Sequence, residues 1–184
     1  MAGTISLSHP LGRLFSALTE RNFIQKLGLA DMDIISYISR FLIDFTHIDN
    51  LYRIKNVKGK PLDEVGEMLL ESNPLLQGSS FIRERQVRKH IGDYTLFFTG
   101  IFPESLKRMR RSPRLDYFLD YIKAGKESYR IVAEYDYGPY QQTAPLFRKL
   151  AHLFDFCVVG LNFVRADLDS IRHQYYRKVK HLFS

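Results

Sequence analysis

The sequence is poor in residues that mark several common protein classes. It contains one cysteine, Cys157, and no tryptophan. A single cysteine cannot form an internal disulfide, which excludes a disulfide-stabilised scaffold. Residues Met1 to His9 lack the cationic start and apolar run of a signal peptide, so we expect a reducing, cytoplasmic location.

Long hydrophobic runs are also missing. The apolar stretch Tyr94–Phe102 is shorter than the roughly 18 to 20 residues that cross a bilayer, and residues 150–164 are interrupted by His152, Asp155 and Asn162. We therefore do not expect a transmembrane protein. The sequence has no phosphate-binding glycine loop, no zinc-binding spacing of Cys and His, and no Gly-x-Ser-x-Gly elbow. These absences favour a binding or interaction protein over an enzyme.

Helical periodicity dominates the rest of the sequence. Apolar residues recur at every third or fourth position within segments that are bounded by proline and glycine, with little period-two alternation. One stripe consists of Ile34, Ile38, Phe41, Phe45, Ile48 and Tyr52. The pattern predicts an all-α fold in which residues 1–184 form a single compact bundle of five or six helices.

Proline, glycine and capping residues indicate where these helices begin and end. They are expected from Pro10 to Gly28, from the cap Asp31 to about Gly59, from Pro61 to Asn73, from Phe81 (capped by Ser80) to Phe102, from Ser112 to Gly138, and from Thr143 or Pro145 to His181. The last helix is the longest, and it is apolar almost all round between Phe147 and Val164. Such a helix belongs in the middle of a bundle, so we expect it to be central together with the helix at 81–102.

Two short motifs share the pattern His, aliphatic residue, any residue, Asp, aromatic residue. They are His90 to Tyr94 and His152 to Phe156. On a helix this spacing places His and Asp on one face, and both faces continue into apolar residues, so each pair is expected at the margin of the core. Two other pairs, Asp44 with His47 and Asp169 with His173, lie on polar faces, where solvated salt bridges explain them.

Three interpretations of His90, Asp93, His152 and Asp155 remain open. The favoured one is structural: each buried Asp accepts a hydrogen bond from its own His or from a nearby arginine, and no cofactor is needed. The alternative is a mononuclear Fe, Mn or Zn site with oxidoreductase or hydrolase activity, although the supporting carboxylates of known bundle sites are missing. The third is a general base oriented by its Asp, but no nucleophile is identifiable. Cys157 is expected to be an inert core thiol with a raised pKa.

Basic residues suggest a separate site. The formal net charge is +7, and five cations lie within residues 107–114: Lys107, Arg108, Arg110, Arg111 and Arg114. These side chains could hold phosphates by charge-assisted hydrogen bonds, together with Arg172, Arg177, Lys178 and Lys180 near the C-terminus. A nucleic acid, another phosphate-bearing surface or a protein are the candidate partners, and a homo-oligomer stays open. The alternative is a solvated basic turn.

Overall fold

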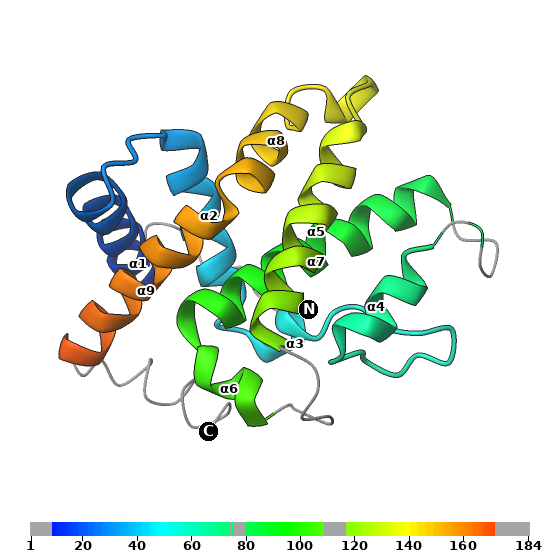
Figure 1. Cartoon of the computed structure of the whole chain (residues 1–184), viewed down its shortest axis with the longest axis horizontal. Helices are drawn as coiled ribbons and strands as arrows, with labels where there is room; N and C mark the ends of the chain where they lie inside the picture. The colour runs from blue at the N-terminus through cyan, green and yellow to red at the C-terminus, as the bar shows by residue number, and fades with distance from the viewer. Residues whose placement is uncertain (1–8, 74, 76–79, 109–116, 172–184) are drawn as a thin grey trace.

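Nine α-helices form most of the part of the chain that the structure describes (Figure 1). The structure is a computed structural model and describes residues 9–73, 75, 80–108 and 117–171. The helices are α1 (Pro10–Arg21), α2 (Met32–Asp44), α3 (Ile48–Leu51), α4 (Val65–Glu71), α5 (Phe81–Ile101), α6 (Pro103–Arg108), α7 (Tyr117–Glu134), α8 (Ala144–His152) and α9 (Phe154–Ile171). A π-helix, Asn22–Lys26, extends α1, and a 3-10 helix, Gly138–Tyr140, precedes α8. The predicted all-α fold is confirmed.

Helix α5 runs through the middle of the molecule. Every residue from His90 to Phe102 is buried, and α7 and α9 pack against this part of the helix. The hydroxyl groups buried there bond within the helix: Thr95 Oγ1 donates to the Ile91 carbonyl at 2.7 Å, and Thr99 Oγ1 donates to the Thr95 carbonyl at 2.7 Å. Because these polar atoms are satisfied locally, the helix can be surrounded by apolar side chains. Its predicted central position is confirmed.

Glycines let α5, α7 and α9 approach closely. A Cβ atom at Gly92 would lie 2.4 Å from the Tyr129 ring of α7, and one at Gly125 would lie 2.4 Å from the Phe154 ring. A Cβ atom at Gly100 would lie 2.5 Å from Leu161 of α9. Since real Cβ atoms do not approach other atoms so closely, these positions fix the separation between the central helices.

Local sequence signals set the starts of three helices as predicted. Pro10 opens α1, where its missing N–H costs no helical hydrogen bond. The Asp31 carboxylate accepts hydrogen bonds from the backbone N–H groups of Asp33 and Ile34 at the start of α2. Ser80 Oγ accepts from the N–H of Arg83 at the start of α5. Each cap satisfies backbone donors that have no partner within the helix.

The predicted second helix is too long. Instead of continuing to about Gly59, α2 ends at Asp44, and the short helix α3 follows. Two side chains bond to carbonyl groups at this break, beside backbone N–H groups: Thr46 Oγ1 donates to the Ile43 carbonyl at 2.6 Å, and Asn50 donates to the Asp44 carbonyl at 3.1 Å. Side chains of this kind compete with the helical pattern, which explains the break within an unbroken apolar stripe.

The predicted C-terminal helix is interrupted at Leu153. This residue adopts φ −100° and ψ 17°, and it separates α8 from α9, which follow one another along nearly the same line in Figure 1. Helix α9 also has an exposed face, on which Phe156 is 56% and Val159 is 43% exposed. It is therefore less central than predicted, because only its opposite face packs against α5. Residues 172–181 of the predicted helix lie outside the described residues.

Asp167 connects α9 to the π-helix. Its carboxylate accepts hydrogen bonds from Arg21 at 2.6 Å, Asn22 at 2.6 Å and Lys26 at 3.1 Å. Partial burial raises the pKa of Asp167, but these three donors outweigh it and lower the pKa to about 2. Asp167 therefore stays charged at neutral pH, and its ion pairs hold α9 against the π-helix and the end of α1.

Among the helices of the described residues, none combines the length and the apolar character needed to cross a membrane.

Candidate functional site

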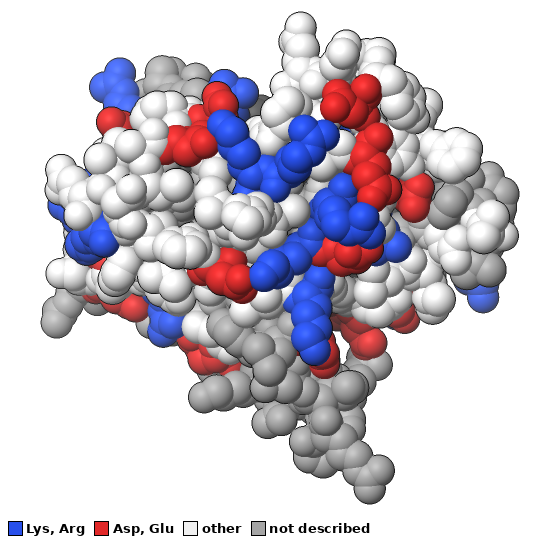
Figure 2. Space-filling model, turned by 45° about the horizontal axis from the view of Figure 1, so that its top comes forward, with Lys and Arg blue, Asp and Glu red and all other residues white. Residues whose placement is uncertain are grey.

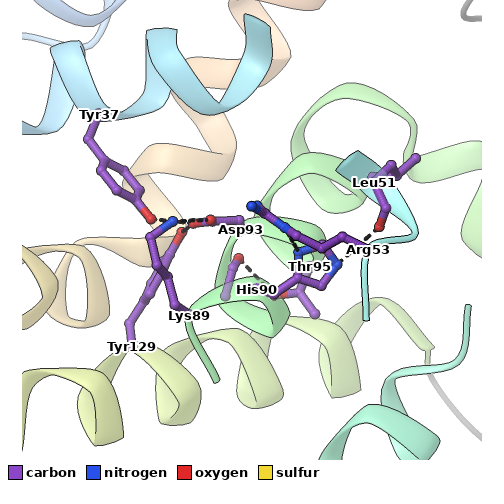
Figure 3. Close-up of polar contacts among 9 residues, drawn as sticks. Tyr37, Leu51, Arg53, Lys89, His90, Asp93, Thr95 and Tyr129 are labelled. Atoms are coloured by element: carbon purple, nitrogen blue, oxygen red, sulfur yellow. Dashed lines mark hydrogen bonds and ion pairs between the residues drawn. The ribbon is translucent and has the colours of Figure 1, made fainter. Parts of the chain in front are cut away.

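Asp93 is the most buried acidic side chain of the central helix. Its side chain has no exposed surface, and one carboxylate oxygen, Oδ1, accepts hydrogen bonds from Tyr37 at 2.5 Å and Tyr129 at 2.8 Å. The other oxygen, Oδ2, accepts from Lys89 Nζ at 2.8 Å. Figure 3 shows that the three donors approach from α2, α7 and α5. Asp93 therefore joins three helices through one charged group.

Tyr37 and Tyr129 can act as hydrogen-bond donors to Asp93 because their hydroxyl groups stay protonated. Burial, and next to it the charge of Asp93, hold the pKa of Tyr37 and Tyr129 well above the usual value for tyrosine. Both hydroxyl groups thus keep their protons at neutral pH and act as donors. Hydrogen bonds to a charged acceptor each contribute about 1.5 to 3 kcal/mol, and the partly exposed Lys89 neutralises the carboxylate. The arrangement suits a permanent structural junction.

His90 lies on the same helix but does not contact Asp93 through a hydrogen bond. Its Nδ1 atom accepts from Arg53 Nε at 3.0 Å, and its Nε2 atom is 3.0 Å from the Leu51 carbonyl (Figure 3). Since Arg53 can only donate, Nδ1 is unprotonated and Nε2–H donates to Leu51. Burial, followed by the charge of Arg53, lowers the pKa of His90 to about 3. The imidazole is neutral, and both nitrogens are used within the fold.

This neutral histidine makes folding stability depend on pH. In the unfolded chain the pKa of His90 is near 6.5, so as pH falls the unfolded chain binds the proton before the folded protein does. We therefore expect full stability above pH 6.5 and a loss of about 1.4 kcal/mol per pH unit from this residue between pH 6.5 and 3. Urea unfolding at pH 7 and pH 5.5 measures the slope before most carboxylates titrate. His90→Gln should flatten it, while His152→Gln, at an exposed position, should leave it unchanged.

The second motif is on the surface. His152 and Asp155 are exposed, and Asp155 forms an ion pair with Lys126 of α7 at 2.7 Å. The expectation that this pair lies at the margin of the core is wrong. The break at Leu153 places His152 at the end of α8 and Asp155 at the start of α9, on the outer side of the molecule. The two motifs therefore share a sequence pattern but not an environment.

The four predicted metal ligands do not form one site. In the described ranges no three His, Cys, Asp or Glu side chains are grouped so that they could hold a metal ion. Both nitrogens of His90 have protein partners, and Asp93 is saturated by two tyrosines and a lysine. The geometry instead supports the structural interpretation for His90 and Asp93. The partners differ from those expected, since Asp93 contacts tyrosine and lysine and not its own histidine or an arginine.

The predicted partners missed Tyr37 and Tyr129, although one signal was available. Tyr129 belongs to the apolar stripe of α7, and a tyrosine hydroxyl in a core needs a hydrogen-bond partner. The sequence did not show which acceptor Tyr129 meets, because Asp93 lies 36 positions away. Tyr37 carried no such signal, because it lies beside the core stripe of α2. Cys157 is as predicted: it is fully buried, and burial raises its pKa to about 12.

A groove of about 900 Å³ lies between α7 and α8, and His152 is at its edge. Both of its arginines are paired with acids: Arg130 with Glu127 at 2.6 Å and with Glu134 at 2.5 Å, and Arg148 with Asp136 at 3.3 Å. Figure 2 shows a face on which a band of Lys and Arg is bordered by Asp and Glu on both sides. The groove is thus of mixed charge and is not a strongly positive site.

The predicted anion-binding residues lie only partly within the described chain. Lys107 and Arg108 end α6, and their side chains are not described. Arg110, Arg111 and Arg114 lie outside the described residues, between α6 and α7. We name residues 107–114 and 172–180 the two basic segments. They contain nine of the 27 Lys and Arg residues and none of the 20 Asp and Glu residues, so the rest of the chain carries 18 cations against 20 acids.

Comparisons of this chain with models of protein families, with curated proteins and with solved structures found no match.

Proposed function

We propose that this protein binds nucleic acid without catalysis, through phosphate contacts from the two basic segments. The observation that carries the proposal is the distribution of charge. The nine cations of these segments account for the whole positive net charge, since the remaining chain has two more acids than Lys and Arg residues. Clustered Lys and Arg without acids favour polyanions, because each phosphate contact releases condensed counterions.

The placement of the neighbouring helices supports a joint role for the two segments. The first segment begins in α6 and the second follows α9, and these two helices are connected by an ion pair between Glu104 and Arg165 at 3.2 Å. Helix α6 ends at Arg108 and the described part of α9 ends at Ile171, so in the sequence each basic segment lies at the end of one of these two connected helices. This arrangement favours binding to one extended phosphate backbone over two unrelated contacts.

Variants that remove the charge of one basic segment at a time test the proposal. Arg110, Arg111 and Arg114 are replaced together by Ala, and binding to a short fluorescent DNA duplex is followed by fluorescence anisotropy at constant salt. We expect the affinity to fall by about tenfold or more, because each lost phosphate contact removes favourable counterion release. A second variant, with Arg172, Arg177, Lys178 and Lys180 replaced, should have a comparable effect.

A matched control uses three lysines elsewhere. Lys55, Lys58 and Lys60 are exposed in the described loop after α3, so replacing them with Ala removes the same charge. Their removal should change the affinity far less. If the Lys55, Lys58 and Lys60 variant lost as much affinity as the Arg110, Arg111 and Arg114 variant, only net charge would matter. That result would refute a site in the basic segments. Binding to anionic lipid vesicles but not to the duplex would refute nucleic acid as the partner.

A further inference from the structure

Arg85 lies in a part of the molecule that the proposed function does not use. It is on the first half of α5, and 9% of its surface is exposed. Its guanidinium carbon is 3.9 Å from the centre of the Tyr140 ring and 5.6 Å from that of Phe147. Nη2 donates to Thr143 Oγ1 at 3.2 Å. The guanidinium is therefore enclosed between α5 and the turn that connects α7 to α8.

This buried cation has no counterion among the described residues. The groups that act most on its charge are tyrosines, Tyr140 first, and no carboxylate lies within ion-pair distance. Its Nε atom is covered and has no acceptor. Burial lowers the pKa of Arg85, which is the direction expected for a charge without an anionic partner.

Ring stacking does not offset this burial. The cost of removing an unpaired charge from water is larger than the gain from a cation–π contact. The single hydrogen bond to the neutral Thr143 hydroxyl adds only a modest gain. An anion placed against the guanidinium would therefore stabilise the folded protein.

Arg88 adds a second guanidinium, one turn further along α5. It is partly buried, its Nε atom is also covered without an acceptor, and burial lowers its pKa although the charges of Glu84 and Glu127 act in the opposite direction. These two acids have other hydrogen-bond donors: Glu84 accepts from Tyr135 at 2.5 Å, and Glu127 accepts from Arg130 at 2.6 Å. Residues three apart on a helix are neighbours, so Arg85 and Arg88 present two guanidinium groups on the same side of α5.

We propose that Arg85 and Arg88 together bind one phosphate group, as free phosphate or a phosphate monoester, beneath the α7–α8 turn. Guanidinium forks match the oxygen geometry of phosphate. The hydroxyl group of Tyr137, which is 58% exposed and whose ring lies close enough to act on the charge of Arg85, provides a neutral donor at the rim. Because both Nε atoms are covered, binding requires the side chains of the turn to shift. This site is separate from the two basic segments and does not depend on nucleic-acid binding.

Thermal unfolding in phosphate tests the site. Inorganic phosphate is titrated at constant ionic strength, with chloride replacing it in the reference samples. Phosphate should raise the melting temperature of the wild-type protein beyond chloride, because a ligand of the folded state stabilises it by mass action. Arg85→Met should weaken the phosphate affinity by about tenfold or more. Without phosphate this variant should be at least as stable as the wild type, since it removes an unpaired buried charge and keeps an apolar stem.

Further variants and a second ligand in the same experiment show whether phosphate binds at Arg85 and Arg88. Arg130→Met is the control, because Arg130 is exposed and already paired with Glu127 and Glu134, and it should leave the phosphate effect intact. Arg88→Met should reduce the effect, and phenyl phosphate compared with inorganic phosphate distinguishes a monoester from free phosphate. An equal effect of phosphate and chloride on the wild type would overturn the proposal. So would an undiminished phosphate effect in Arg85→Met, or a destabilised or unfolded Arg85→Met protein in phosphate-free buffer.

Discussion

Replacing Asp93 with Asn should lower the free energy of unfolding by about 3 kcal/mol, because two buried hydroxyl groups and Lys89 lose a charged acceptor. The substitution leaves Lys89 without its counterion and replaces a carboxylate that serves three donors by a neutral amide. The amide oxygen can still accept from both tyrosines, which share Oδ1, but these bonds lose their charged acceptor, and the amide N–H₂ group then faces the Lys89 ammonium, which is also a donor. Urea-induced unfolding, followed by circular dichroism, measures the change.

Asp155→Asn is the matched control, because Asp155 occupies the same position in the second His-x-x-Asp motif. Its side chain is 56% exposed and its partner Lys126 is 41% exposed, so the loss should be below about 1 kcal/mol. A similar loss of stability in the two variants would show that stability depends on the sequence motif and not on the burial of Asp93. That result would contradict the assignment of Asp93 as a junction between α2, α5 and α7.

Gly92→Ala should destabilise the protein by about 3 kcal/mol, even though alanine favours a helix by about 1 kcal/mol. The new methyl group would lie 2.4 Å from the Tyr129 ring, which is fully buried and cannot move aside. Displacing this ring would also stretch the hydrogen bond from Tyr129 to Asp93. Thermal unfolding of the purified variant measures the change in stability.

Gly66→Ala provides the comparison. Gly66 is in the exposed part of α4, and a Cβ atom there would meet nothing within 4 Å. The substitution should therefore stabilise the protein by up to about 1 kcal/mol. If Gly92→Ala were also stabilising, α5 and α7 would not be packed as closely as described.

Local features of the sequence predicted the fold well. The caps Asp31 and Ser80 and the opening Pro10 act within one helical turn, so their residue types are informative without any knowledge of the tertiary structure. The breaks at Leu153 and after Asp44 were missed, because the apolar periodicity continues through them. An apolar stripe reports which residues are buried, but it does not report whether the backbone between them stays helical.

The environments of the two motifs were not predictable from their own residues. His90 meets Arg53 and the Leu51 carbonyl, which lie 37 and 39 positions away in the sequence, and Asp93 meets Tyr37, 56 positions away. Only the packing of α2, the loop after α3 and α7 around α5 brings these groups together. His152 lacks such surroundings because its helix lies at the surface. Identical spacing on a helix therefore fixes which side chains share a face, while tertiary packing decides their chemistry.

The salt dependence of duplex binding tests the proposed function most directly. If the two basic segments contact phosphates, the logarithm of the association constant should fall linearly with the logarithm of salt concentration. The slope can approach about −8 if all nine cations take part, since each contact contributes about −0.9, and it should become less steep in the Arg110, Arg111 and Arg114 variant. A slope near zero, or no binding at low salt, would contradict the account.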